Sequence, residues 1–225
     1  MWIKICGNTT LEDARFAAQC GADAVGFVFA PSPRQVNADV VRKITENLPP
    51  QLEKYGVFVD AGFDEIVSTV AASGLTGVQI HRSSDVHLPL RLRQHFAQFP
   101  RHISILRVLP YKEAEFERQL TELGQTDSLD GLLVDSSTAR AVGGTGTSFN
   151  WFEARSTFLR AASHLRLIAA GGLAPANVKQ AIQILRPWGV DVVSGVESAP
   201  GKKDPARVLA FIRSAQEAAE EILAS

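Results

Sequence analysis

The stretch MWIKICGNTTLEDARFAAQCGADAVGFVF, residues 1–29, contains the pattern that decides the fold. Its apolar run Trp2–Cys6 predicts a β-strand, the turn after it leads into an amphipathic helix over Leu11–Cys20, and Ala24–Phe29 predicts a second strand. Acidic residues in the first helical turn and Gly21 after the last turn are common signals for the start and end of a helix. This order of strand, helix and strand favours a parallel pair joined by a right-handed crossover.

The same pattern recurs along the whole chain. Apolar runs begin at intervals of roughly 20 to 35 residues, a spacing that suits strand–helix units better than hairpins. The eight predicted strands are Trp2–Cys6, Ala24–Phe29, Tyr55–Val59, Gly77–Ile80, Ile103–Val108, Gly131–Val134, Leu167–Ala169 and Val190–Ser194. Further helices are predicted at Asp64–Ala72, at Glu113–Leu123, from Pro175 onward and from Pro205 onward.

Eight such units favour a closed (β/α)₈ TIM barrel over an open doubly wound sheet. The chain has 225 residues, close to the size of about 250 that is typical of this barrel, whereas open sheets usually have about five or six strands. The first turn, Cys6-Gly7-Asn8-Thr9-Thr10, also lacks the G-x-G-x-x-G pattern of dinucleotide-binding sheets. Because no linker or low-complexity segment divides the chain, we expect a single barrel domain over residues 1–225.

The composition excludes several classes of protein. A chain that is 45% hydrophobic and 21% charged is globular rather than disordered. Its 23 basic and 24 acidic residues lack the excess of positive charge that a nucleic acid or a polybasic membrane surface requires. We find no apolar run of about 18 residues and no signal peptide, so with only two cysteines we expect a cytoplasmic protein. The histidines and cysteines show no metal-ligand spacing, and we expect no metal site.

In a barrel of this kind the active site lies at the carboxyl ends of the strands, which makes the end of the first strand important. The alternation of side chains places Lys4 and Cys6 on one face and Ile3 and Ile5 on the other. We expect the apolar pair to face the helices and the polar pair to face the interior. A thiol near an ammonium should have a lowered pKa, so Cys6 is a candidate base.

Two aspartates follow apolar strands and compete for the role of an acid. Asp135 comes directly after Gly131–Val134, where burial would raise its pKa and suit it to donate a proton. Asp60 has a similar position after Tyr55–Val59, although it also suits the N-cap of the helix after Gly62. His81, at the end of the fourth strand, either faces the mouth of the barrel or caps a turn.

Two glycine-containing segments follow the last two strands. Residues 170–173, Ala-Gly-Gly-Leu, come after the seventh strand, and residues 193–197, Val-Ser-Gly-Val-Glu, come after the eighth. Glycines let backbone N–H groups approach an anion, and phosphate at these two loops is a recurrent feature of the barrel. A third loop, residues 143–146, Gly-Gly-Thr-Gly, is placed to close over a substrate. Arg34 lies in the stiff segment Pro31-Ser32-Pro33-Arg34. Its guanidinium either binds a carboxylate or is a solvated group at the surface.

Several of these motifs occur together, and in this order, in one family. They are Lys4-Ile5-Cys6-Gly7, Gly26-Phe27-Val28-Phe29 with Ser32-Pro33-Arg34, Gly77-Val78-Gln79-Ile80-His81, Leu133-Val134-Asp135, Gly143-Gly144-Thr145-Gly146, Ala170-Gly171-Gly172-Leu173 and Val193-Ser194-Gly195-Val196-Glu197 with Pro200-Gly201. Over essentially its whole length the chain resembles the phosphoribosylanthranilate isomerases of tryptophan biosynthesis.

The resemblance implies an isomerase without a cofactor. Its reaction would be an Amadori rearrangement of an aminoaldose, N-(5′-phosphoribosyl)anthranilate, to the aminoketose 1-(2-carboxyphenylamino)-1-deoxyribulose 5-phosphate. The family's catalytic residues match Cys6 as general base and Asp135 as general acid. Arg34 would meet the anthranilate part, and the phosphate would be held by the backbone of Gly171, Gly172, Ser194 and Gly195. Members occur as monomers and as dimers, and the absence of a long apolar surface run favours a monomer.

The chain departs from the family's usual pattern at two positions. Arg82 follows His81 where glycine is usual, and Asn150 stands where an aspartate is frequent. Neither departure touches the proposed base or acid, so substrate affinity is the property they would alter. Two other functions stay open at this point. A histidine-pathway isomerase would carry an aspartate at the position of Cys6, and a non-catalytic barrel would have no need to retain Cys6, Asp135 and Arg34 together.

Overall fold

The structure is a computed structural model that describes residues 1–111, 116, 118, 120, 122, 127–135, 150–161 and 166–224. Most of the helix predicted at Glu113–Leu123 and the whole of the Gly143–Gly146 loop lie outside the described residues.

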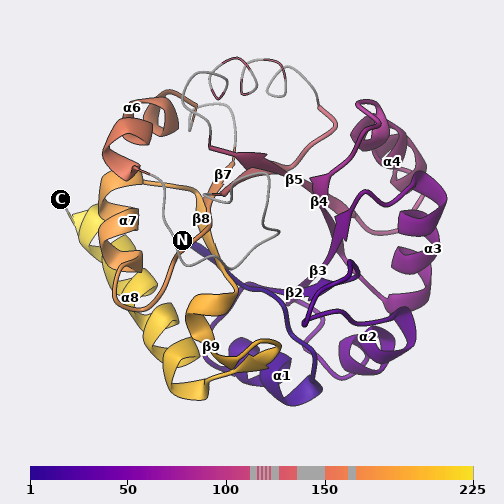
Figure 1. Cartoon of the computed structure of the whole chain (residues 1–225), viewed down its shortest axis with the longest axis horizontal. Coiled ribbons are helices and arrows are strands. Elements are labelled where there is room, and N and C mark those ends of the chain that lie inside the picture. Colours follow the sequence, from indigo (N-terminus) through magenta and orange to yellow (C-terminus); the bar gives the residue numbers. More distant parts are fainter. Residues whose placement is uncertain are drawn as a thin grey trace.

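Eight parallel strands form a closed barrel, in which each strand pairs with its neighbours in chain order and β8 pairs with β1 (Figure 1). The strands are β1 (Trp2–Ile5), β2 (Ala24–Val28), β3 (Glu53–Val59), β4 (Gly77–Arg82), β5 (Ser104–Pro110), β6 (Gly131–Asp135), β7 (Leu167–Ala169) and β8 (Gly189–Val192). Every predicted strand overlaps one of them, and the predicted (β/α)₈ barrel is confirmed. All eight carboxyl ends therefore open on one face.

Helices surround the barrel and connect its strands. The described helices are α1 (Leu11–Gln19), α2 (Ala38–Thr45), α3 (Phe63–Ser73), α4 (Leu88–Phe96), α6 (Trp151–Ala161), α7 (Val178–Leu185) and α8 (Pro205–Ala224). The hydroxyl of Thr10 accepts the Asp13 N–H and caps α1. Pro205 opens α8 as expected, but Pro175 lies in a turn before α7 and not in its first helical turn. In the described residues, no helix is long and apolar enough to cross a membrane.

The side chains of β1 alternate between two apolar regions. Ile3 and Ile5 face the large core between the barrel and its helices. Trp2 belongs to a smaller cluster inside the barrel, where its ring meets Tyr55 edge-on. Lys4, on the same face as Trp2, points into the interior above this aromatic pair and is fully buried. The interior is thus apolar at the amino end of the barrel and polar toward its mouth.

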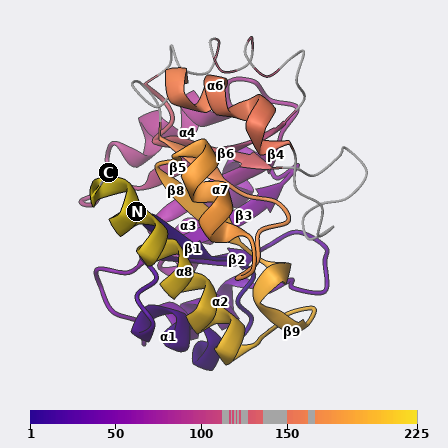
Figure 2. The same cartoon turned by 90° about the vertical axis from the view of Figure 1, so that its left-hand side faces the viewer.

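A short antiparallel hairpin follows the last barrel strand. After the 3₁₀ turn η1 (Ser194–Val196), β9 (Glu197–Ala199) pairs with β10 (Lys202–Lys203), and α8 begins two residues later. In Figure 2 the hairpin lies at the opposite end of α8 from the C-terminus. The hairpin brings Glu197 and Lys203 together, and both side chains are buried.

Candidate active site

Lys4 is the centre of a buried polar layer inside the barrel. Its Nζ donates to Oδ1 of Asp191 at 2.8 Å and to Oε1 of Gln79 at 2.9 Å. Asp191 is the register partner of Lys4 on β8, and Gln79 comes from β4 across the interior. Burial acts to lower the pKa of Lys4, but the Asp191 carboxylate, with a smaller contribution from Cys6, outweighs burial and raises that pKa. Lys4 is therefore a permanent cation beneath the mouth.

Cys6 comes directly after β1, and its thiol points toward the barrel axis. A Cβ built on Gly26 would lie 2.4 Å from the Cys6 Sγ and 3.1 Å from the Lys4 Nζ. Glycine on β2 thus leaves the space in which the thiol and the ammonium meet. The interior positions predicted for Lys4 and Cys6 agree with this geometry.

The predicted lowering of the Cys6 pKa is wrong. Burial raises the pKa of the thiol more than the Lys4 ammonium lowers it, and the carboxylate of Asp191 raises it further. The prediction considered Lys4 alone, whereas most of the charge of Lys4 is already balanced by Asp191. In the substrate-free protein the thiol is therefore protonated at neutral pH.

Asp135 is the last residue of β6 and is buried, with 7% of its surface exposed. His81, near the end of β4, lies beside it, with 3.9 Å between His81 Nε2 and Asp135 Oδ2. Burial lowers the pKa of His81 more than the Asp135 carboxylate raises it. His81 therefore faces Asp135 as a neutral imidazole at neutral pH. Of the two alternatives for His81, the position toward the mouth is the one observed.

Asp60 has a different environment and does not cap the helix that follows it. The N-cap of α3 is Gly62, and the Asp60 carboxylate instead accepts hydrogen bonds from Nε and Nη2 of Arg82 at 2.5 to 3.0 Å. Hydrogen bonding to Arg82 holds the pKa of Asp60 below its ordinary value. Since both side chains are more than half exposed, Asp60 is a solvated carboxylate and a poor proton donor.

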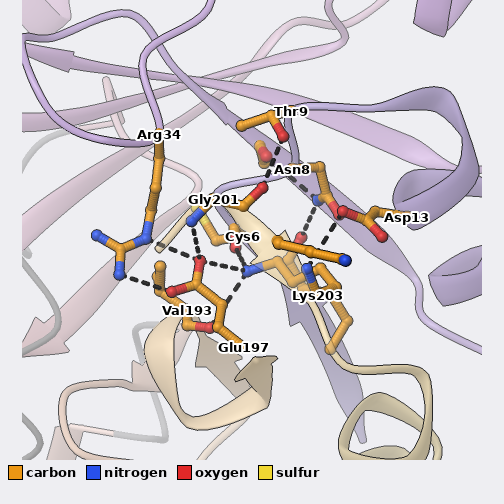
Figure 3. A network of polar contacts seen from close by, with 12 residues as sticks. Cys6, Asn8, Thr9, Asp13, Arg34, Val193, Glu197, Gly201 and Lys203 are labelled. Atoms are coloured by element: carbon orange, nitrogen blue, oxygen red, sulfur yellow. Dashed lines mark hydrogen bonds and ion pairs between the residues drawn. The ribbon is translucent and has the colours of Figure 1, made fainter. Parts of the chain in front are cut away.

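Arg34 lies over the hairpin after β8 and forms a bidentate ion pair with Glu197. Its Nε donates to Oε1 at 2.8 Å and its Nη2 donates to Oε2 at 2.7 Å. The Lys203 Nζ approaches the same carboxylate, at 3.2 Å from Oε1, and also donates to the carbonyl oxygens of Cys6 and Val193. Figure 3 shows these groups together, with the remaining terminal nitrogen of Arg34 pointing away from Glu197.

The two predicted phosphate loops are in contact. Gly171 and Gly172 have φ angles of 78° and 65°, in the left-handed region that favours glycine. A Cβ on Gly195 would lie 2.0 Å from the carbonyl oxygen of Leu173, so only glycine permits the two loops to pack together. Ser194 begins η1 beside them. Within the described part of the chain, the N–H groups of Gly171 and Gly172 donate to no protein acceptor.

Four residues of this region have side-chain roles that the sequence did not predict. Asp191 and Gln79 hold Lys4, while Glu197 and Lys203 hold Arg34 and the backbone of Cys6. Asp191 could have been found, because it is the one charged residue in the apolar run of the eighth strand. Lys203 had no local signal, since its partners are distant in the sequence. In the described residues, no cluster of three or more His, Cys, Asp or Glu side chains could hold a metal ion.

Comparison with known proteins identifies one protein family. The family model described as N-(5′phosphoribosyl)anthranilate (PRA) isomerase matches residues 3–214. A protein of Geotalea uraniireducens named N-(5′-phosphoribosyl)anthranilate isomerase is 40% identical over 217 residues, which are 95% of this chain and 98% of the relative.

Solved structures agree with this result. The crystal structure of phosphoribosyl anthranilate isomerase from Thermotoga maritima superposes with a TM-score of 0.81 at 36% identity, over 96% of this chain and 99% of the other. A second structure of such an isomerase, in complex with reduced 1-(o-carboxyphenylamino)-1-deoxyribulose 5-phosphate, gives a TM-score of 0.79 at 33% identity over the same shares.

Proposed function

The chain belongs to the N-(5′-phosphoribosyl)anthranilate isomerase family, and from this premise we propose a chemical role for each group of its site. The protein is an isomerase of tryptophan biosynthesis. Its proposed reaction is an Amadori rearrangement that converts the aminoaldose into 1-(2-carboxyphenylamino)-1-deoxyribulose 5-phosphate. Cys6 acts as general base and Asp135 as general acid.

Asp135 performs the first step in this proposal. Its carboxyl group donates a proton to the ring oxygen of the ribosylamine, the C1′–O bond breaks, and the nitrogen lone pair forms a C1′=N bond. The product is an open-chain iminium ion, and Asp135 is left as a carboxylate. The burial of Asp135 at the end of β6 supports this role, because a desolvated carboxyl group retains its proton more readily. Neutral His81 beside it adds no charge that would compete with the proton.

Cys6 performs the second step as a thiolate. It removes the proton from C2′, the electron pair of that bond forms C1′=C2′, and the C=N electrons return to nitrogen. The resulting enolamine tautomerises to the ketone, so no other reactant is consumed. The iminium ion adds a positive charge next to the reacting carbon. In the complex this charge acts with Lys4 to favour the thiolate, against the burial that keeps Cys6 protonated in the free protein.

The two ends of the substrate are bound by different parts of the mouth. Arg34 binds the anthranilate carboxylate, because a guanidinium fork matches a carboxylate in shape and charge. The backbone of Gly171, Gly172, Ser194 and Gly195 binds the phosphate, supported by the left-handed conformation of the first two and the close packing of the two loops. We further propose that the protein is a monomer, which light scattering would detect as a mass near 24.3 kDa.

The observation that carries the proposal is the thiol of Cys6 seated over Gly26 beside the Lys4 ammonium. Its test is the Cys6→Ser variant, followed by the loss of substrate fluorescence as phosphoribosylanthranilate is consumed. A hydroxyl is a far weaker base than a thiolate, and loss of a general base costs about 10²–10⁴-fold in rate. A kcat near the wild-type value in a folded variant would contradict the assignment. Failure of the wild-type protein to turn over this substrate would favour the histidine-pathway isomerase or a non-catalytic barrel.

A further inference from the structure

We propose that Glu197 and Lys203 are positioning residues that aim the Arg34 guanidinium at the substrate carboxylate and keep a net positive charge there. The inference rests on the proposed function, in which Arg34 receives the anthranilate carboxylate. Glu197 and Lys203 would touch no substrate themselves, since their side chains are only 4% and 2% exposed. They act through Arg34, whose side chain is 13% exposed and reaches the mouth.

The geometry of the ion pair determines which edge of Arg34 faces a ligand. A guanidinium has five N–H donors on two edges, each of which matches one carboxylate. Glu197 occupies the edge formed by Nε and Nη2. Among the described residues, Nη1 donates to no protein acceptor, and Figure 3 shows this nitrogen on the side away from Glu197. The second edge, Nη1 with the other hydrogen of Nη2, is therefore presented to a ligand in a fixed direction.

Lys203 gives the Arg34–Glu197 pair a net positive charge. Arg34 and Glu197 alone form a neutral pair, which would attract an anion weakly. The Nζ of Lys203 donates to three oxygens, those of Cys6, Val193 and Glu197, at 2.5 to 3.2 Å. Burial lowers the pKa of Lys203 from its ordinary value, even though the Glu197 carboxylate acts to raise it. The three donated hydrogen bonds nevertheless require the ammonium form. The three side chains together thus carry one positive charge, and the substrate carboxylate meets that charge at the exposed edge of Arg34.

The same ammonium links the carboxylate site to the proposed base. Lys203 binds the carbonyl oxygen of Cys6 and the Glu197 carboxylate at once, so one buried group fixes the backbone of the base relative to Arg34. The Gly201 N–H adds a further hydrogen bond to Oε1 of Glu197 at 3.3 Å. This rigidity matters because the reacting carbon and the carboxylate belong to one small substrate, and misplacement of one end displaces the other.

The ionisation of Glu197 is consistent with a permanent pair. Burial acts to raise the pKa of Glu197, but the hydrogen bond from Arg34 and the charge of Lys203 outweigh it and lower that pKa. The Glu197 carboxylate is therefore charged across the neutral pH range, and the orientation of the Arg34 guanidinium does not depend on pH there.

The Glu197→Gln variant distinguishes the orientation of Arg34 from the net charge of the site, because the two effects change the affinity for a carboxylate in opposite directions. Removal of the carboxylate charge leaves two cations at the site, so long-range attraction alone would tighten the binding of a carboxylate. Loss of the bidentate pair lets Arg34 change direction, which would weaken it. We expect weakening, by about 10-fold, as the loss of a charge-assisted hydrogen bond would produce.

Two probes make the measurement specific: reduced 1-(o-carboxyphenylamino)-1-deoxyribulose 5-phosphate and its anilino counterpart without the ring carboxylate. For each purified full-length variant, calorimetry gives the dissociation constant of the anilino compound divided by that of the carboxylate compound. Glu197→Gln and Lys203→Met should each reduce this ratio, while the affinity for the anilino compound changes less than about 3-fold. In an Arg34→Met background, Glu197→Gln should have no further effect on the ratio.

Glu46→Gln is the control, since it removes a carboxylate from an exposed ion pair with Arg42. It should leave both affinities unchanged. Equal weakening of both probes by Glu197→Gln, tighter binding of the carboxylate probe, or a full effect in the Arg34→Met background would each overturn the inference. If Glu197→Gln does not fold, Lys203→Met decides by the same ratio. Wild-type protein that fails to isomerise phosphoribosylanthranilate would instead refute the proposed function, so the two failures are distinguishable.

Discussion

Charge compensation controls the thiol of Cys6 more than any single neighbour does. Lys4 favours the thiolate, Asp191 and burial oppose it, and Lys203 contributes a smaller favourable charge from behind the backbone. A base with a raised pKa in the free protein is protected from side reactions, because the thiolate is the reactive form. We therefore expect Cys6 to be activated by the positive charge of the iminium intermediate.

The titration of Cys6 tests this balance. In a Cys20→Ser background, the rate of iodoacetamide alkylation should rise with pH and show a midpoint above the ordinary value of 9.0. Asp191→Asn should lower that midpoint, because the Lys4 charge would then act on the thiol alone. A shift of one pKa unit would make alkylation at pH 8 about tenfold faster. Cys6→Ser in the same background is the control for other sites. An unchanged or raised midpoint in Asp191→Asn would contradict this interpretation.

A second prediction at the residue scale distinguishes the two aspartates. Asp135→Asn should be nearly inactive, because it removes the proton donor for ring opening, while Asp60→Asn should retain substantial activity. Asp60 is solvated and paired with Arg82, and an exposed pair of this kind contributes little to stability. Steady-state kinetics and thermal unfolding of both variants are the measurements. Abolished turnover in Asp60→Asn with an unchanged Tm, together with an active Asp135→Asn, would identify the other aspartate as the acid.

At the scale of elements, the loops after β7 and β8 form one unit, since Gly195 lies against the backbone of Leu173. Any side chain at Gly195 must displace that backbone. The effect of a substitution would therefore be greater than a simple obstruction of the anion.

We predict that inorganic phosphate competes with substrate at tens of millimolar or less, and that Gly195→Ala weakens this competition. The same variant should be less stable by about 1–3 kcal/mol, the usual cost of an overpacked site. Gly62→Ala is the matched control, because a Cβ there meets no atom within 4 Å. It should leave phosphate competition unchanged. Competition that is absent from the wild-type protein, or unaltered in Gly195→Ala, would contradict the proposed phosphate site.

At the scale of the whole molecule, the two ends of the barrel have different tasks. The proposed site lies at the carboxyl ends of the strands, whereas Asp130 closes the other end. It accepts hydrogen bonds from the Ile105 N–H, Arg93 and His102. Burial acts to raise the pKa of Asp130, but these hydrogen bonds outweigh it and hold the pKa below its ordinary value of 3.8.

The sign of the resulting pH dependence follows from linkage. A carboxylate with a lowered pKa in the folded state stabilises the protein above its unfolded pKa, and this contribution is lost as pH falls through the folded pKa. Asp130→Asn should therefore lower the free energy of unfolding by about 1.5–3 kcal/mol at pH 7 and by less below about pH 4. Urea unfolding at both pH values measures this difference, and kcat should be unchanged. Asp85→Asn, which affects an exposed pair with Arg91, is the control. A pH-independent difference would contradict the assignment.

The sequence alone determined the features that depend on local rules. Strand periodicity sufficed for the barrel, and each predicted strand begins and ends within two residues of the observed one, while Pro205 marked the start of α8. The alternation along β1 also sufficed to place Lys4 and Cys6 inside. These features require only the residues adjacent in the chain, because side-chain direction in a strand repeats every two positions.

Only the tertiary structure decided which charges meet. Asp191 binds Lys4 from 187 residues away, and Glu197 binds Arg34 from 163 residues away. Barrel closure between β1 and β8 creates both encounters, and no local pattern encodes them. The direction of the Cys6 pKa depends on the sum of burial and several such charges. Each of these contributions changes with distance, so the direction of the Cys6 pKa shift depends on where the closed barrel places the charged side chains.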